Sequence, residues 1–374
     1  MPYIALVLAT PTEVKTTSKE RTYTTADHPL EHKALPTLSD RPEVQLTVVV
    51  PMYNEEMRLK AMLDDTTQWL ESVREKGESL SASSGTCDET AALTQPLLTY
   101  EVLMVDDGSR DKTYDVAMAY AKQCQLRNGA EIRVTCLHQN RGKGAAVRHG
   151  VLHARGSFIL FADADGATRF SDLRMLAKEM VRVCTPAGHG IVVGSRAHLV
   201  TSEAVVKRSF IRNLLMRCFH LVLSLLMRPP TLDSVWHQAV PQGAKITRLP
   251  RQPEIKDTQC GFKLFSRPTA ALIFPLAHID RWIFDVELLL LAEMACRVSE
   301  AAHVLRPEAQ RGDGDTLLRL PLPVSEVSVH WTEIDGSKIN LLTDSLRMGR
   351  DLIVIRMNYW LRRWQSPPSI YACE

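Results

Sequence analysis

Five short apolar runs recur between residues 46 and 194, and polar residues follow each of them. The runs cover residues 46–50, 100–105, 132–138, 157–162 and 190–194. Continuous apolar runs of this length, rich in β-branched residues, are typical of parallel strands that are buried on both faces. The pattern therefore predicts a mostly parallel central sheet.

Helical periodicity separates these runs. Apolar residues at positions 59, 62, 63 and 70 are spaced as on one face of a helix, and further helices are predicted over 113–122 and 144–154. Either Ser109 or Asp111 can cap the helix that begins at residue 113. Strands that alternate with helices predict an α/β fold with right-handed crossovers.

Polar clusters stand directly after four of the predicted strands. They read Tyr-Asn-Glu-Glu, Asp-Asp-Gly-Ser, Asp-Ala-Asp-Gly and Gly-Ser-Arg. Ligands of parallel α/β sheets bind beyond the carboxyl ends of the strands. We therefore expect these clusters to meet in one composite site.

Asp163 and Asp165 flank a single small residue at the end of the predicted strand 157–162. Two carboxylates in this arrangement can hold Mg²⁺ or Mn²⁺ through oxygen ligands. A bound divalent ion neutralises a diphosphate and stabilises it as a leaving group. The alternative is a solvated turn, but the acidic strand ends nearby favour a metal site.

Asp106 and Asp107 end another predicted strand. A carboxylate there can accept hydrogen bonds from a uracil or ribose edge, or it can cap the next helix, and each aspartate can take one of these roles. Glu55 has the same two interpretations, as a ribose contact or as an acid favoured by the dipole at a helix start.

Two stretches offer basic groups for phosphate. Lys143 lies in the loop 140–144, whose backbone amides can approach a diphosphate, although its spacing is not that of a Walker A motif. Lys207, Arg208 and Arg212 lie on a stretch with an apolar face, and the two arginines share one helical face. That face can hold an acceptor phosphate at a bilayer surface, or it can be an ordinary solvated face over the core.

Three acidic residues late in the chain, Asp257, Asp285 and Glu287, are further candidates. One of them can serve as a general base. An acceptor phosphate is already ionised at neutral pH and hardly needs a base. The alternative is that these carboxylates position arginine or lysine side chains.

Composition narrows the class of protein. The 374 residues carry a net charge of only +2, so no overall basic field points to nucleic acid. The eight cysteines form no CxxC pair and no zinc-type cluster, which is typical of free thiols in a reducing compartment. The apolar run 3–9 is too short to span a bilayer and lacks the basic start of a signal peptide.

The same pattern sets the expected organisation. Residues 1–44 are expected to form a polar, flexible leader, residues 45–360 one domain, and residues 361–374 a tail. Ser, Gly and Pro-rich or irregular stretches predict insertions at 76–95, 229–254 and 300–320.

Several blocks carry a resemblance to a known family. The blocks VVVPMYNEE, VDDGSRDKT, NRGKGAAVRHG, FADADGATRFSDL and GSRAHL resemble the inverting family 2 glycosyltransferases with the GT-A fold. Within that family, the blocks SEAVVKRSFIRNLLM, DTQCGFKLF, RWIFDVELL and VHWTEIDGSKIN resemble the dolichyl-phosphate β-glucosyltransferases. The resemblance covers most of residues 46–360 in order.

The resemblance implies a GT-A fold and the transfer of glucose from UDP-glucose to dolichyl phosphate with inversion. It implies a Mg²⁺ or Mn²⁺ cofactor at Asp163 and Asp165, and a position on the cytosolic side of the endoplasmic reticulum membrane, in protein N-glycosylation. The implied uridine pocket comprises Pro51, Tyr53, Glu55 and Asp106 or Asp107, with Lys143 near the diphosphate. The residues implied for the lipid phosphate and for catalysis are Arg196, Lys207, Arg208, Arg212, Asp165 and Asp257.

Alternatives remain at this point. A dolichyl-phosphate mannosyltransferase would share the fold and the acceptor but use GDP-mannose. A polysaccharide synthase would need several spanning helices, which the sequence lacks. A catalytically inactive scaffold or sugar-nucleotide sensor would be expected to lose the strand-end acids, and these are present. The family usually has an N-terminal membrane helix, so we expect either a truncated chain or peripheral membrane binding; the oligomeric state is left open.

Overall fold

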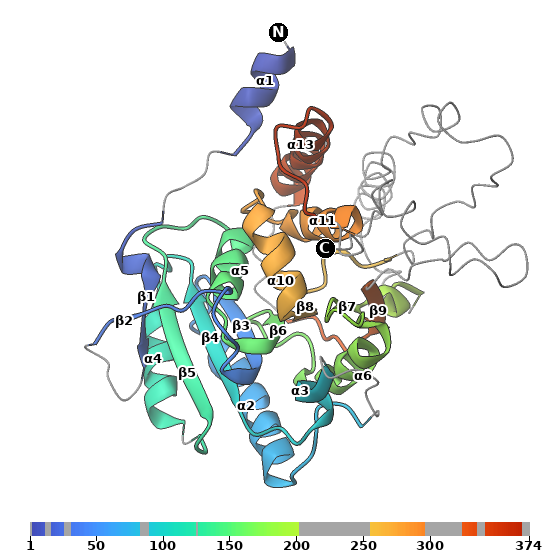
Figure 1. Cartoon of the computed structure of the whole chain (residues 1–374). Coiled ribbons are helices and arrows are strands. Elements are labelled where there is room, and N and C mark those ends of the chain that lie inside the picture. The colour runs from blue at the N-terminus through green and yellow to red at the C-terminus, as the bar shows by residue number, and fades with distance from the viewer. Residues whose placement is uncertain are drawn as a thin grey trace, which may run out of the picture.

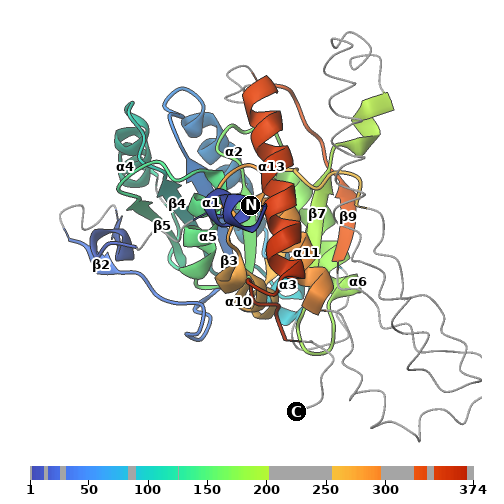
Figure 2. The same ribbon diagram turned by 90° about the horizontal axis from the view of Figure 1, so that it is seen from above.

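The computed structural model describes residues 2–11, 16–25, 31–82, 90–124, 126–201, 255–295, 324–334 and 341–368. A twisted central sheet runs through this part of the chain, and helices cover both of its faces (Figures 1 and 2). The strands lie in the order β2-β1-β5-β4-β3-β6-β8-β7-β9.

The middle of the sheet is parallel, as predicted. Its strands are β3 (Val44–Met52), β4 (Tyr100–Asp106), β5 (Ala130–Cys136) and β6 (Gly156–Ala162). Beyond β6, β8 (Phe262–Ser266) runs antiparallel to both β6 and β7 (Ile191–Ser195), and β9 (Val324–Ser328) pairs with β7 in parallel. All five predicted strands are confirmed, with small shifts at their ends.

The predicted helices are confirmed as well. They are α2 (Leu59–Glu75), α4 (Thr113–Gln123) and α5 (Lys143–Leu152). At the start of α4, the Asp111 carboxylate accepts a hydrogen bond from the Thr113 amide at 3.0 Å. The other described helices are α1 (Pro2–Ala9), α3 (Ala91–Thr94), α6 (Leu173–Val183), α10 (Arg267–Ile273), α11 (Phe284–Ala295) and α13 (Leu341–Trp360), with short 3₁₀ turns at Lys19–Arg21, Phe170–Asp172, Ala197–Thr201 and Phe274–Leu276.

The two faces of the sheet bury separate hydrophobic cores. Because side chains alternate along a strand, Val48 and Val50 of β3 point into one core and Val49 into the other. Helices α2, α4 and α6 close the first core, and α5, α10, α11 and α13 close the second. Burial on both faces explains why the central strands appear in the sequence as continuous apolar runs.

The order in which the chain adds strands to the sheet reverses at β3. It proceeds from β3 through β4 to β5 on one side, and then returns to place β6 on the other side of β3. The loops that follow β3 and β6 therefore lie next to each other at the carboxyl edge of the parallel strands, which is where ligands bind in open α/β sheets.

The described parts of the N-terminal 44 residues differ from the flexible leader that was expected. Strand β1 (Thr22–Thr25) pairs antiparallel with β5, and β2 (Lys33–Ala34) pairs with β1. The expectation failed because polar composition does not show that a short strand can complete a sheet edge.

The described parts of the expected insertion 76–95 are also packed, since Leu80 and Leu93 are buried in the first core. The expected insertions 229–254 and 300–320 lie outside the described residues.

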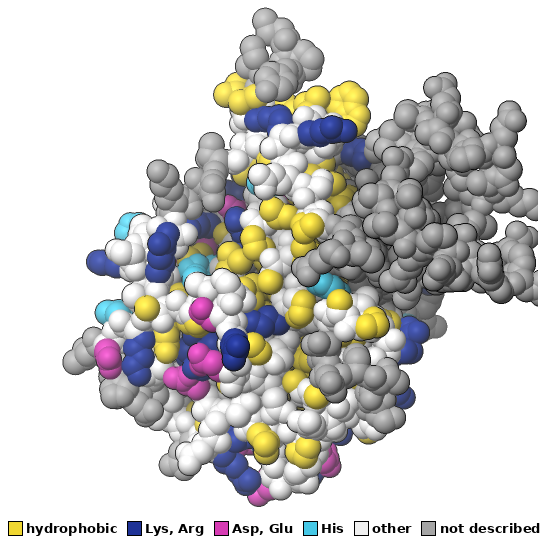
Figure 3. Space-filling view, viewed as in Figure 1, with side chains coloured by type: hydrophobic (Ala, Val, Ile, Leu, Met, Phe, Trp, Pro, Cys, Tyr) yellow, Lys and Arg dark blue, Asp and Glu magenta, His cyan; other side chains and the backbone are white. Residues whose placement is uncertain are grey.

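Hydrophobic and basic side chains gather together at one end of the molecule, over α1 and α13 (Figure 3).

Among the helices of the described ranges, none combines the length and the apolar composition needed to cross a bilayer.

A buried ion network ties the central strands together. The fully buried carboxylate of Glu101 in β4 contacts the guanidinium groups of Arg133 at 2.7 Å and Arg155 at 2.6 Å. The Thr47 hydroxyl donates to it at 2.7 Å. Burial alone would raise the pKa of Glu101, but the two arginines hold that pKa below its usual range.

This network gives the fold a specific response to acid. Since the pKa of Glu101 is lowered on folding, its stabilising contribution is complete above the unfolded pKa and is lost as the pH falls through the folded pKa. We expect Glu101→Gln to lower the free energy of unfolding at neutral pH by about 3 kcal/mol. The variant should lose less further stability than the parent on acidification, as measured by urea denaturation at several pH values.

The control is Glu43→Gln, because Glu43 contacts the same Arg155 from a position that is 58% exposed. It should change stability by less than about 1 kcal/mol. An identical acid response in the Glu101 variant and the parent would contradict this account of the network.

Candidate active site

The first part of the candidate site is the segment that follows β3. Pro51 lies at the end of the strand, and Tyr53 and Glu55 follow in a turn where Asn54 adopts a left-handed conformation with φ of 52°. The Glu55 carboxylate accepts a hydrogen bond from Arg58 Nε at 2.8 Å and is 11% exposed. The backbone amide of Glu55 donates to the Thr113 hydroxyl, and this hydrogen bond joins the turn to the start of α4.

The two aspartates at the end of β4 have different surroundings. Asp106 accepts hydrogen bonds from the amide and hydroxyl of Ser109 and so holds its own turn. Asp107 accepts from the amides of Arg141 and Gly142, both at 2.8 Å. Burial raises the pKa of Asp107 to about 7, although the two amide hydrogen bonds oppose this shift. One aspartate thus shapes a turn and the other fastens the loop before α5.

Lys143, the first residue of α5, reaches the end of β6. Its ammonium group lies 2.6 Å from an oxygen of Asp163 and 5.2 Å from the centre of the Phe161 ring. Burial works against the charge on Lys143, but the carboxylates of Asp163 and Asp285 raise its pKa above its ordinary value. The loop predicted to approach a diphosphate is therefore linked to the predicted metal motif.

Two glycines permit this close packing. A Cβ on Gly261 would lie 1.9 Å from Asp163 Oδ2. Gly142 has φ of 112°, and a Cβ there would lie 2.5 Å from the Asp280 carbonyl oxygen. Larger residues at either position would displace the Asp163 carboxylate or the start of α5.

The chemistry of Asp163 and Asp165 suits a divalent ion that is shared with a substrate. The Asp163 side chain is 31% exposed, and Asp165 is half-buried with one oxygen that accepts from the Ala167 amide at 3.0 Å. Mg²⁺ is commonly held by one or two carboxylates, with substrate phosphates and water completing its shell. Within the described ranges, no cluster of three or more metal-ligating side chains forms a closed protein site. The pair thus fits an ion that arrives with a diphosphate.

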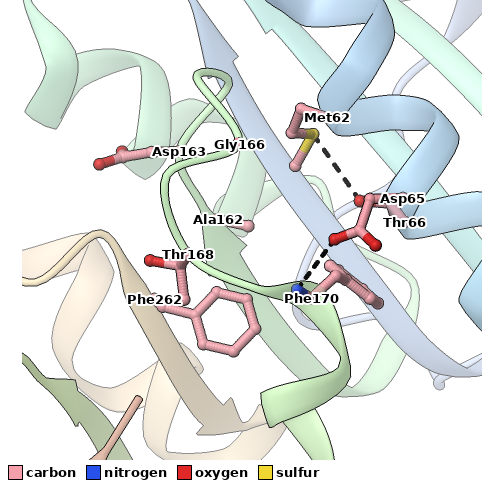
Figure 4. Close-up of a pocket in the computed structure, with 9 residues that line it drawn as sticks. All are labelled: Met62, Asp65, Thr66, Ala162, Asp163, Gly166, Thr168, Phe170 and Phe262. Atoms are coloured by element: carbon pink, nitrogen blue, oxygen red, sulfur yellow. Dashed lines mark hydrogen bonds between the residues drawn. The ribbon is translucent and has the colours of Figure 1, made fainter. Parts of the chain in front are cut away.

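A small pocket lies beside this loop, between the end of β6 and α2 (Figure 4). Met62, Asp65 and Phe170 line one side and Phe262 the other, while the Asp163 carboxylate points away from α2. Asp65 accepts a hydrogen bond from the Phe170 amide at 3.0 Å. The side chains that line this pocket pack between the Asp163 loop and α2.

Arg196 and Asp257 form a second polar centre at the end of β7. The Asp257 carboxylate accepts from Arg196 Nε at 2.7 Å, from a terminal guanidinium nitrogen at 2.9 Å and from the Arg196 amide at 2.9 Å. The guanidinium also lies 5.6 Å from the Trp331 ring centre. Although burial alone would raise the pKa of Asp257, the hydrogen bonds and charge of Arg196 lower it. This geometry favours a carboxylate that positions an arginine over one that acts as a general base.

The other two acidic residues late in the chain, Asp285 and Glu287, also accept hydrogen bonds. Buried Asp285 accepts a hydrogen bond from Lys263 at 2.7 Å, and Glu287 accepts from the amides of His278 and Ile279. The structure thus favours positioning roles for them as well. Lys207, Arg208 and Arg212 lie outside the described residues, so their assignment to the lipid phosphate stays a prediction.

Glu20 is a residue that the sequence analysis did not identify. Its buried carboxylate accepts two hydrogen bonds from the Arg141 guanidinium, at 2.7 and 2.8 Å, and one from the His138 amide at 2.8 Å. It therefore fixes the loop whose amides hold Asp107. No local pattern marks this role of Glu20, because Arg141 and His138 follow more than a hundred residues later.

Comparison with known proteins agrees with this arrangement. A family model for glycosyl transferase family 2 matches residues 47–198, which include the strand-end motifs. A dolichyl-phosphate β-glucosyltransferase of Drosophila melanogaster is 41% identical over 90% of this chain and 82% of its own length. The enzymes of that name from Homo sapiens and Saccharomyces cerevisiae are 38% and 36% identical, over 82% and 80% of their lengths and 90% and 88% of this chain.

Among solved structures, a glucosyl-3-phosphoglycerate synthase of M. tuberculosis with Mn²⁺, UDP-glucose and phosphoglyceric acid is 18% identical. It aligns with a TM-score of 0.42 over 87% of this chain and 86% of its own.

The predicted GT-A class is confirmed by the family match and by the mostly parallel sheet with helices on both faces. Several relatives from distant eukaryotes share one name and cover most of the chain. On this evidence the chain belongs to the dolichyl-phosphate β-glucosyltransferase family of family 2 glycosyltransferases.

Proposed function

We propose that this chain transfers glucose from UDP-glucose to dolichyl phosphate with inversion, giving dolichyl β-D-glucosyl phosphate and UDP. Its identity to enzymes of this name supports the reaction. The observation that carries the proposal is the meeting of the Asp107 loop, Lys143 and Asp163 at the carboxyl ends of β4 and β6. The product would supply glucose to lipid-linked oligosaccharide assembly in protein N-glycosylation.

The donor would lie along the ends of β3, β4 and β6. We assign the uridine part to Pro51, Tyr53, Glu55 and one of the two strand-end aspartates, Asp106 or Asp107. Lys143 would contact the diphosphate. Asp163 and Asp165 would hold Mg²⁺ or Mn²⁺, whose charge offsets that of the departing UDP.

Bond formation would proceed by in-line attack of a dolichyl-phosphate oxygen on the anomeric carbon as the bond to UDP breaks. Since the phosphate is already ionised, the protein supplies position and charge stabilisation. Arg196, which Asp257 orients, is assigned to the acceptor phosphate. Lys207, Arg208 and Arg212 are assigned to the same group.

A lipid acceptor favours a reaction at a membrane. We propose that the chain acts at the endoplasmic reticulum membrane with its active site facing the cytosol. Support comes from the lipid acceptor in the relatives' names and from the exposed hydrophobic and basic side chains over α1 and α13 (Figure 3).

Donor choice is the test of the function. Purified protein with Mn²⁺ and dolichyl phosphate is given radiolabelled UDP-glucose or GDP-mannose, and label is counted in the organic phase. We expect lipid-soluble label from UDP-glucose and background from GDP-mannose. Label from GDP-mannose alone would overturn the glucose assignment in favour of the mannosyltransferase alternative.

Asp165→Asn tests the metal assignment. Asparagine can still accept from the Ala167 amide, so the turn should persist while an anionic ligand is lost. We expect transfer to fall at least about a hundredfold, and EDTA to abolish transfer by the parent enzyme. The control Asp65→Asn, in the pocket behind the loop, should remain active; full activity of Asp165→Asn or of the EDTA-treated parent would refute the assignment.

Glu20→Ala tests the remote clamp on the Asp107 loop. We expect the KM for UDP-glucose to rise about tenfold, with a smaller change in the KM for dolichyl phosphate, because the loop lies on the donor side. Glu20→Gln should recover part of the loss. The control is Lys19→Ala, an exposed position in the same turn, and equal increases in both KM values for Glu20→Ala would contradict a donor-side role.

A further inference from the structure

Helix α13 exposes an apolar stripe on the side that faces away from the core. Leu346 is 76% exposed, Ile353 52% and Trp360 61%. These residues are seven positions apart, so they fall on one face of the helix. The opposite side of the helix faces the protein: Leu352 and Ile355 are buried in the second core, and the polar Asp351 and Asn358 are buried as well. An ordinary surface helix would carry polar residues on its outer face.

The N-terminal helix adds exposed apolar side chains at the same end of the molecule. Val7 and Leu8 of α1 are 42% and 81% exposed. Thr10, just after α1, accepts a hydrogen bond from Asn358 Nδ2 of α13 at 3.1 Å, so the two helices are tied together. Figures 1 and 2 show α1 beside α13 at the same end of the molecule. We call the stripe with the exposed end of α1 the α13 face.

Positive charge surrounds the α13 face. Residues 341–363 contain five arginines and two aspartates, and no lysine or glutamate. Arg347 and Arg350 have half-exposed side chains, whereas their partners Asp344 and Asp351 are nearly buried. Figure 3 shows Lys and Arg side chains next to hydrophobic ones at this end. The exposed side chains of the α13 face are therefore mainly arginines and apolar residues.

This combination fits a lipid surface better than a second copy of the chain. Two copies that paired through this face would bring their arginines together, and like charges at an interface are unfavourable. Anionic lipid headgroups complement the arginines, the aliphatic side chains can enter the acyl boundary, and tryptophan favours the interfacial zone.

We propose that the α13 face lies on an anionic lipid surface and sets the orientation of the active site above it. The inference rests on the proposed function in one respect, namely that the acceptor is a membrane lipid. It goes further by naming the contact face.

The buried side of α13 connects this face to the active site. The Tyr359 hydroxyl donates to Glu287 at 3.1 Å, and Glu287 fixes the amides of His278 and Ile279. Just beyond, Trp364 stacks on the His278 ring with centres 4.1 Å apart.

The loop that Glu287 fixes touches the active site directly. Its Asp280 carbonyl accepts from the Ala145 amide at 3.0 Å, in the first turn of α5 that begins with Lys143. A lipid surface beneath α13 would therefore hold α5 and the Asp163 motif at a defined height.

The experiment measures sedimentation of the full chain with vesicles, either pure phosphatidylcholine or with roughly 30 mol% phosphatidylserine. We expect the parent to bind the anionic vesicles, and Ile353→Glu with Trp360→Ser to weaken binding at least about tenfold. Leu98→Glu is the matched control, because Leu98 is an apolar residue that is 66% exposed on another part of the surface. It should bind like the parent.

Binding of the double variant as tight as that of the parent would overturn the proposal. A parent dimer in sedimentation velocity that the double variant abolishes would also overturn it, in favour of a second copy on this face. Unchanged thermal unfolding of the variant would show that lost binding is not lost folding.

A transfer assay separates this inference from the proposed function. With a short-chain, water-soluble isoprenyl phosphate the double variant should turn over like the parent, and with dolichyl phosphate in vesicles it should be slower. Absence of transfer by the parent to either acceptor, with intact vesicle binding that the variant loses, would refute the function and leave the α13 face standing.

Discussion

The contact between Lys143 and Asp163, at 2.6 Å, is the constraint on which the site depends. It joins the first residue of α5 to the carboxyl end of β6, next to the point where the chain reverses its travel across the sheet. Both side chains are partly buried, where an unpaired ammonium or carboxylate would be costly, so each stabilises the charge of the other. The pair keeps a negative group for a cation and a positive group for a phosphate in one place.

Residues from several distant segments of the chain hold this contact in place. Gly261 leaves room for the Asp163 carboxylate, and Asp107 holds the amide of Gly142 just before Lys143. Glu20 fixes Arg141 from the N-terminal segment, and the Asp280 carbonyl holds the first turn of α5 from the other side. Such supports restrict the motion of the site, which is what catalysis by positioning requires.

The sequence predicted those parts whose cause is local. The central strands could be recognised because burial on both faces leaves continuous apolar runs, and the strand-end acids could be placed because parallel strands end at the same edge. Arg196 and Asp257 were named as site residues, but their pairing could not be found in this way, and neither could Glu20 or the outer stripe of α13. Their roles arise from contacts between distant segments or from which face of a helix the fold covers, and periodicity reports neither.

The central claim is that the carboxyl edge of the parallel strands binds a nucleoside diphosphate together with a divalent ion. The most direct test is calorimetric titration of UDP into the full chain with and without Mn²⁺, for the parent and for Asp163→Asn. The account predicts clear binding by the parent with Mn²⁺, much weaker binding without it, and little effect of Mn²⁺ on the variant. Equal affinity of UDP for parent and variant, unaffected by Mn²⁺, would contradict it.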